Sequence, residues 1–124
     1  MKPAIISFIV GAVCYTATEL IYRGRTHISM TIAGGICMLV LYLIFRLNNK
    51  ISLPLRCVIS MLVITGVEFI TGLIVNKWLG LDVWDYSNRK LNVLGQICPL
   101  FSFYWFLMGI PISITSDILL RYFP

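Results

Sequence analysis

The sequence predicts an all-α membrane protein that crosses the bilayer four times, as two tandem helical hairpins joined by a long aromatic loop. Of its 124 residues, 59% are hydrophobic and only 12% are charged, and the mean hydropathy is +0.90. A soluble globular domain carries about a quarter charged residues. The apolar residues also gather in four stretches of roughly 20 residues, the length that a helix needs to cross about 30 Å of hydrocarbon.

The predicted spans cover residues 3–22, 28–45, 53–75 and 99–119, and we expect them to form a single transmembrane domain over residues 1–124. Each span is predicted to be a helix, because a segment surrounded by lipid must satisfy its backbone polar groups internally. The first apolar run is longer than the core of a signal peptide. It is followed by Glu19 and Arg23 rather than by a small-residue cleavage site, so we expect it to be retained.

The three predicted linkers differ in length and composition. The first two, residues 23–27 and 46–52, are short and polar. The third, residues 76–96, mixes charges with apolar and aromatic side chains, namely Trp78, Leu81, Val83, Trp84, Tyr86, Leu91 and Val93. This density of aromatic residues favours a loop that packs at the membrane interface or over the end of the bundle.

Four crossings place both termini on one side of the membrane, and the ten basic residues divide evenly between the two sides. If Arg23 and Arg25 are engaged by acidic groups in the bundle, the terminal side has the excess, and we expect both termini in the cytoplasm. A true tie would allow dual topology and an antiparallel dimer. The net charge of +5 lies at membrane boundaries. No nucleic-acid-binding motif accompanies it, so we expect no nucleic-acid partner.

Each predicted hairpin carries one glutamate near the outgoing end of its first span, Glu19 and Glu68. A Gly-x-Ile-Cys sequence follows each glutamate, at residues 34–37 and 95–98. We interpret this as an internal repeat, in which both units share one orientation about an axis along the membrane normal. Such a repeat would place the two glutamates at one depth.

Glu19 and Glu68 are the strongest functional candidates, because a carboxylate in hydrocarbon is costly unless it is protonated, paired or facing water. Tyr15, Glu19 and Arg23 recur every four residues, and Glu68 and Asn76 share one helical face. Both stripes are predicted to face the bundle. The alternative is a glutamate near a helix end that snorkels to the interface or simply clips two helices together.

Arg23, Arg25 and His27 follow the first span directly. Arg23 lies one turn beyond Glu19 and can meet it in a bidentate fork, which would leave Arg25 or His27 to bind an anionic ligand. The alternative is an interfacial cluster that sets topology. His27 is the only histidine, and no ligand spacing indicates a metal site, so we expect neither a metal nor another cofactor.

The densest polar and aromatic cluster lies in the third linker, at residues 84–87. If this linker folds back, Asp85 joins the side of the bundle that carries Glu19 and Glu68; the alternative is an Asx-type turn with interfacial aromatics. We assign substrate binding or gating to Glu19, Arg23, Arg25, His27, Glu68, Trp84, Asp85 and Tyr86. Secondary roles go to Tyr15, Asn76, Ser87 and Gln96.

The remaining polar and small residues are interpreted as architectural. We expect the cysteines to be buried free thiols; they are Cys14, Cys37, Cys57 and Cys98. Ser7 and Gly11 have the small-xxx-small spacing that lets helices approach closely. Gly34 and Gly35 allow either close packing or a break in the second span.

Taken in order, these residues resemble the ABC-transporter type IV (CmpB-like) family of small bacterial membrane proteins. The first half of the family pattern is matched by Tyr15, Glu19, Arg23-Gly24, Thr26-His27, Ser29-Met30 and Gly34-Gly35. The second half is matched by Glu68-Phe69, Gly72, Asn76, Trp84-Asp85-Tyr86-Ser87, Asn92, Gly95-Gln96-Ile97-Cys98, Ser102 and Trp105. Phe106 departs from the pattern, since we expect a small residue there.

The resemblance implies a transport role in the cytoplasmic membrane of a bacterium. The chain has no nucleotide-binding motif, so ATP-driven activity would require a separate ATPase. Four spans are few for a permease, which predicts a homodimer or a larger complex. Two other functions stay open, a structural or regulatory subunit and a membrane-embedded enzyme that acts on a lipid or other amphiphile. In the enzyme, the carboxylates and His27 would serve as general acid and base.

Overall fold

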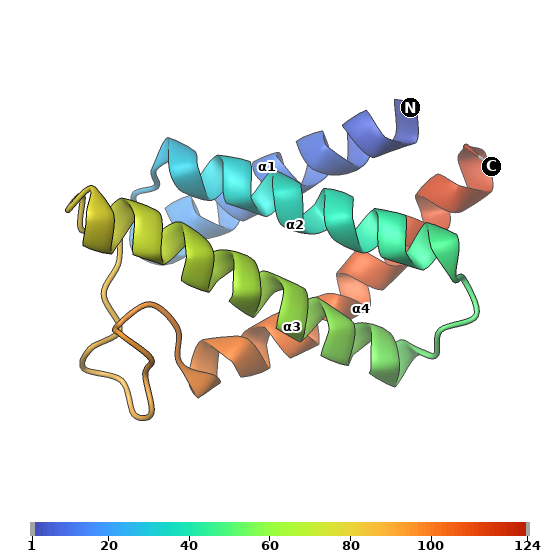
Figure 1. Cartoon of the computed structure of the whole chain (residues 1–124). Coiled ribbons are helices and arrows are strands. Elements are labelled where there is room, and N and C mark those ends of the chain that lie inside the picture. Colours follow the sequence, from blue (N-terminus) through green and yellow to red (C-terminus); the bar gives the residue numbers. More distant parts are fainter. Residues whose placement is uncertain (1, 124) are drawn as a thin grey trace.

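The computed structural model describes residues 2–123 as four long helices and one short π-helical segment (Figure 1). The helices are α1 (Lys2–Arg23), α2 (Ile28–Leu47), α3 (Leu53–Gly72) and α4 (Pro99–Tyr122), and the π-helical segment η1 (Leu73–Trp78) extends α3. All four are long and apolar enough to cross a membrane, with α3 and η1 forming one span. The predicted all-α class with four membrane spans is therefore confirmed.

Local sequence explains where the helices start and stop. Gly24, with φ of +73°, ends α1 in a left-handed conformation that favours glycine. His27 caps α2, since its Nδ1 accepts a hydrogen bond from the Ser29 backbone N–H at 3.1 Å. Pro54 and Pro99 occupy the first turns of α3 and α4, where a missing N–H costs no hydrogen bond.

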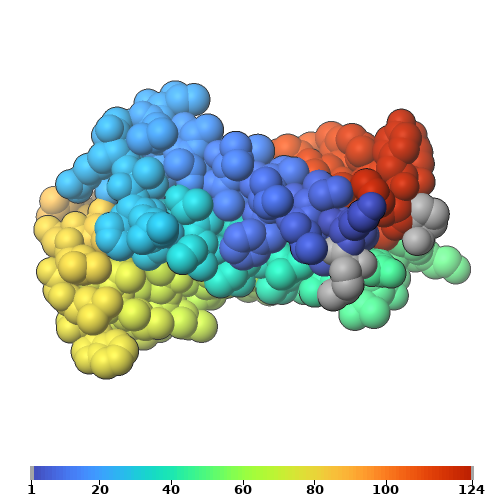
Figure 2. Space-filling view, turned by 90° about the horizontal axis from the view of Figure 1, so that it is seen from above, coloured from blue at the N-terminus to red at the C-terminus, as the bar shows by residue number. Residues whose placement is uncertain are grey.

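The helices pair as two hairpins, α1 with α2 and α3 with α4, while α1 and α4 touch only sparingly. Figure 1 shows both chain ends at one end of the bundle and the loop before α4 at the other. In Figure 2, the yellow segment around η1 and the red end of α4 lie at opposite ends in the same way. The chain therefore has a terminal end and a loop end.

Glycines determine how closely α1 and α2 approach. A Cβ atom on Gly11 would lie 2.5 Å from the carbonyl oxygen of Gly34, and one on Gly34 would lie 2.6 Å from the Cβ of Tyr15. Such separations do not occur between real atoms without movement of the backbone. The Gly34-Gly35 pair thus serves close packing, and α2 continues through it unbroken.

The segment between η1 and α4 starts later than the predicted linker, because η1 prolongs the third span to Trp78; α4 begins at Pro99, the residue at which the predicted fourth span starts. The structure gives different conformations to the two Gly-x-Ile-Cys sequences, which the repeat hypothesis treats as counterparts. Residues 34–37 lie inside α2, whereas residues 95–98 precede α4 and contain Gly95 with φ of +72°. Cys14 is also exposed on α1 rather than buried.

Candidate functional site

Both glutamates of the predicted site are buried at the loop end of the bundle. Glu19 lies in the last turns of α1 and is 6% exposed, and Glu68 lies just before the end of α3 and is 5% exposed. Neither side chain therefore points into lipid or into water. Each must be stabilised by partners within the protein.

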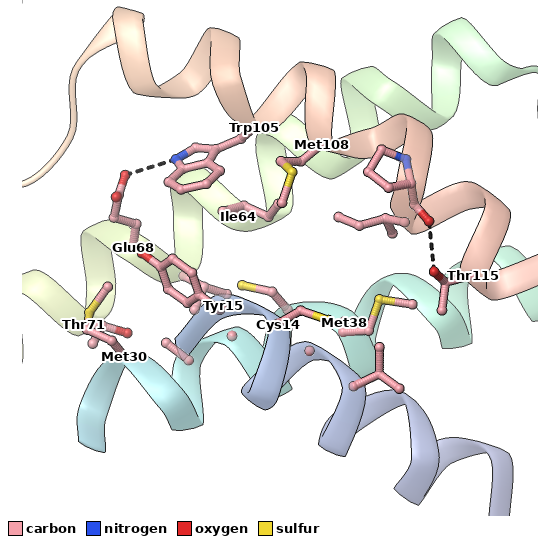
Figure 3. Close-up of a pocket in the computed structure, with 18 of the residues that line it drawn as sticks. Cys14, Tyr15, Met30, Met38, Ile64, Glu68, Thr71, Trp105, Met108 and Thr115 are labelled. Carbon is pink, nitrogen blue, oxygen red and sulfur yellow. Dashed lines mark hydrogen bonds between the residues drawn. The ribbon is translucent and has the colours of Figure 1, made fainter. Parts of the chain in front are cut away.

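Glu68 is held by two neutral donors. The Tyr86 hydroxyl donates a hydrogen bond to Oε2 at 3.1 Å, and the Trp105 indole N–H donates one to Oε1 at 3.4 Å. Figure 3 shows the second contact reaching from α4 across to α3. Among residues 2–123, no arginine or lysine lies within ion-pairing distance of this carboxylate.

Glu19, in contrast, has a cation beside it. Arg23 Nη1 lies 3.5 Å from Glu19 Oε2, and Arg23 Nη2 donates a hydrogen bond to the Val83 carbonyl oxygen at 2.5 Å. The bidentate fork expected for this pair is not formed, because the second amino group of Arg23 bonds to the loop instead. Arg23 therefore ties α1 to the segment that precedes α4.

Asn76 in η1 holds the same segment against α3. Its Oδ1 accepts hydrogen bonds from the backbone N–H groups of Val83 at 2.6 Å and Trp84 at 3.3 Å, while its Nδ2 donates to Gln96 Oε1 at 2.8 Å. Gln96 in turn accepts at its backbone carbonyl from the Trp84 indole at 3.0 Å. A Cβ atom on Gly72 would lie 2.9 Å from the Trp84 ring, so the loop can pack against α3 at this position only because the residue is a glycine.

We expect Asn76→Ala to release this loop. The substitution removes the side-chain acceptor of two backbone N–H groups, and an unmade buried hydrogen bond costs about 1–3 kcal/mol, so amide hydrogen exchange at Val83 and Trp84 should accelerate about 10-fold to 100-fold. Asn88→Ala is the matched control, because Asn88 is exposed in the same loop. Unchanged exchange at Val83 in Asn76→Ala would contradict this anchoring role.

The predicted cluster at residues 84–87 divides into inward and outward side chains. Trp84 is buried at 4% exposure against Met30 and Val75. Tyr86 stacks on Phe101 with ring centroids 4.8 Å apart. Burial, and then the nearby Glu68, raise the pKa of the Tyr86 hydroxyl, so it stays protonated and donates its hydrogen bond.

Asp85 and Ser87 form the Asx-type turn that was the alternative interpretation. Asp85 Oδ1 accepts a hydrogen bond from the Ser87 backbone N–H at 2.9 Å. This bond lowers the pKa of the Asp85 carboxyl group, which is exposed. Asp85 nevertheless lies on the side of the bundle that carries Glu19 and Tyr86.

Two hollows adjoin these residues. A cavity of about 150 Å³ lies between the helices and is lined almost wholly by apolar side chains, with Glu68 as its only charged group (Figure 3). A larger groove of about 650 Å³ runs between α1, α4 and the loop, and it contains Glu19. Tyr15 and Trp105 line both hollows, and their rings meet edge to face with centroids 6.0 Å apart. Trp84 and Met108 also line both hollows, and we call the ring pair of Tyr15 and Trp105, which lies where the groove adjoins the cavity, the Tyr15–Trp105 partition.

The other candidate residues predicted from the sequence differ in whether they line the groove or the cavity. Arg25 is exposed and lines the groove, as does Arg23. His27 lines neither hollow, because its ring caps α2 and also lies 2.8 Å from the Ser29 hydroxyl. Within residues 2–123, no three His, Cys, Asp or Glu side chains come together in a way that could hold a metal ion.

Sequence reasoning missed a second polar centre, at the terminal end of the bundle. Arg56 is 5% exposed, and its Nη1 lies 2.8 Å from both Ser113 Oγ and Asp117 Oδ1 on α4. Its remaining nitrogens donate to the carbonyl oxygens of Ile51 and Asn49, each at 3.1 Å. Arg56 counts in the sequence only as a boundary charge, because no local pattern links it to a residue 61 positions away.

We expect Arg56→Met to lower the free energy of unfolding by about 3 kcal/mol, because it leaves two carbonyl groups and one hydroxyl without their donor. Asp117→Asn should cost less than about 1 kcal/mol, since the Asp117 side chain is 55% exposed. Arg46→Met, at an exposed position in the last turn of α2, is the control. Thermal unfolding of the purified variants measures all three. An Arg56→Met protein as stable as Arg46→Met would refute the structural role.

Comparison with known families supports the resemblance noted in the sequence. The family model described as "Putative ABC-transporter type IV" matches residues 4–123, nearly the full chain. The chain belongs to this family. Neither the curated proteins nor the solved structures contain a significant match. Family membership and four apolar helices identify a multi-pass membrane protein whose architecture fits a membrane transport subunit.

Proposed function

We propose that this protein is a membrane transport subunit that binds its substrate in the groove at the loop end and admits it past the Tyr15–Trp105 partition. Glu19, Glu68 and Arg23 form the polar part of the site. Tyr86, Trp84 and the loop that carries them cover the site at the loop end of the bundle.

The observation that carries this proposal is the environment of Glu68. A buried carboxylate with two neutral donors and no nearby cation is expensive to maintain in a membrane protein, and such groups usually mark a substrate or ion pathway. Arg56, the buried cation at the terminal end, has by contrast an ionic partner in Asp117. Glu68 is also the one charged residue in the lining of the apolar cavity.

The proposal includes partners. Four spans enclose only a small cavity, so we expect the working unit to be a homodimer or a larger complex. ATP-driven movement of the substrate requires a separate ATPase subunit, since the chain contains no phosphate-binding loop. We expect both termini, and hence the terminal end with Arg56, to face the cytoplasm.

The test compares cells that lack the protein with cells that carry the wild type or Glu68→Gln. Transport predicts that the wild type changes the distribution of a solute or lipid across the membrane without changing its chemical identity. A membrane-embedded enzyme, the second function that the sequence leaves open, predicts instead a new chemical species in the lipid or metabolite profile. Appearance of such a species, dependent on Glu68, would overturn the transport proposal.

A further inference from the structure

The groove at the loop end is partly open to its surroundings. Its walls are the outgoing part of α1 and the first turns of α4, two helices that touch only sparingly. Aromatic rings meet across this seam, as in the edge-to-face contact of Tyr22 with Phe101 at 6.4 Å. A hydrophobic molecule can therefore enter sideways, from within the bilayer.

The groove also spans two membrane depths. It reaches Leu107 and Met108, which lie eight and nine residues after the start of α4, or about 12 Å further along the helix axis. Leu107 is 45% exposed and Tyr104 is 42% exposed on this wall. The mouth of the groove is thus at the interface, while its far end lies among acyl chains.

Some charged side chains at the mouth of the groove have an ionic or hydrogen-bonding partner and others have none. Arg23 faces Glu19, and Asp85 accepts from its own turn. Arg25 and Arg89 line the same mouth, and neither guanidinium lies within ion-pairing distance of any carboxylate among residues 2–123. Arg89 instead lies over the Phe101 ring, 5.5 Å from its centroid. The two cations are therefore available to a ligand.

We propose that this groove binds an amphiphile with an anionic headgroup, such as a phosphate-bearing lipid, which enters between α1 and α4. Arg25 and Arg89 hold the headgroup through charge-assisted hydrogen bonds, which suit phosphate oxygens. The tail lies along Leu107 and Met108. That this amphiphile is the transported substrate rests on the proposed transport function. Its binding to the groove does not depend on transport.

Tryptophan fluorescence supplies a direct test of binding. The protein is reconstituted in phosphatidylcholine vesicles as Trp78→Phe, because Trp78 is 79% exposed and outside the groove, which leaves Trp84 and Trp105 as reporters. A small fraction of the lipid is then replaced by phosphatidic acid with brominated acyl chains, or by phosphatidylcholine with the same chains. We expect stronger quenching by the brominated phosphatidic acid.

Removing the two cations should abolish this preference. We expect Arg25→Gln/Arg89→Gln to lower the apparent affinity for brominated phosphatidic acid, measured by quenching, at least 10-fold, since two charge-assisted contacts are lost. Lys77→Gln/Lys90→Gln removes two exposed charges from the same end of the molecule but outside the groove, and it should retain the preference. Soluble glycerol phosphate should not compete, because it lacks the tail.

Three results would overturn the assignment. Equal quenching by both brominated lipids excludes headgroup selection. If Lys77→Gln/Lys90→Gln loses the preference for brominated phosphatidic acid to the same extent, general surface charge explains the preference. Competition by glycerol phosphate makes the ligand a soluble anion rather than an amphiphile. Selective binding together with unaltered transport in Glu68→Gln would leave this inference standing and would refute the proposed function instead.

Discussion

Glu68→Gln is expected to reduce transport at least 10-fold while leaving the protein folded. Glutamine can keep both contacts of the glutamate, because its carbonyl oxygen accepts from the Trp105 indole and its amide group donates to the Tyr86 hydroxyl oxygen. The substitution therefore removes the charge with little change in packing. Uptake or export by cells or vesicles, normalised to the amount of folded protein, measures the effect.

Two further variants separate charge from structure. Tyr86→Phe removes one donor to Glu68 but keeps the ring on Phe101, so we expect a partial loss of transport. Glu19→Gln should also abolish transport, and it should destabilise the protein more than Glu68→Gln because Arg23 then loses its anion. Wild-type transport by both glutamine variants would refute a role of the polar site in transport. Severe unfolding of Glu68→Gln would favour the structural alternative.

Gly11→Ala is expected to lower the free energy of unfolding by about 3 kcal/mol, the upper part of the range for an overpacked interior. The new methyl group would lie 2.5 Å from the Gly34 carbonyl oxygen, so the backbones of α1 and α2 must move apart. Because Tyr15 and Glu19 lie on the same helix, the substitution should also disturb the partition. Thermal unfolding in detergent measures the loss.

Gly66→Ala is the matched control for this prediction. Gly66 lies inside α3, and a Cβ atom there has no neighbour within 4 Å. Alanine favours a helix over glycine by about 1 kcal/mol, so Gly66→Ala should be neutral or slightly stabilising. If the two alanine variants unfold at the same temperature, close α1–α2 packing does not limit stability.

The sequence predicts the four spans well because hydropathy averaged over about 20 residues hardly depends on neighbouring helices. Burial of Glu19 and Glu68 follows from the same physics, since a carboxylate within a span has few tolerable places to point. The capping role of His27 agrees with its position directly before the apolar run of α2.

Other features depend on contacts that no local pattern records. Arg56 and Asp117 pair across 61 residues, and Tyr86 reaches Glu68 only because the loop folds back over α3. The π-helical turn that contains Asn76 is not predicted either, since the sequence places the end of the third span at residue 75. The groove itself arises from weak contact between the first and last helices, which sequence alone does not reveal.

The most direct test of the account is a crystal structure of the purified protein grown from a lipid phase doped with phosphatidic acid. We expect density for a lipid between α1 and α4, with its phosphate at Arg25 and Arg89 and its tail reaching Met108 beside the Tyr15–Trp105 partition. A groove closed by direct contact of α1 with α4, with lipid only on the outer surface and Glu68 walled off from it, would contradict the account.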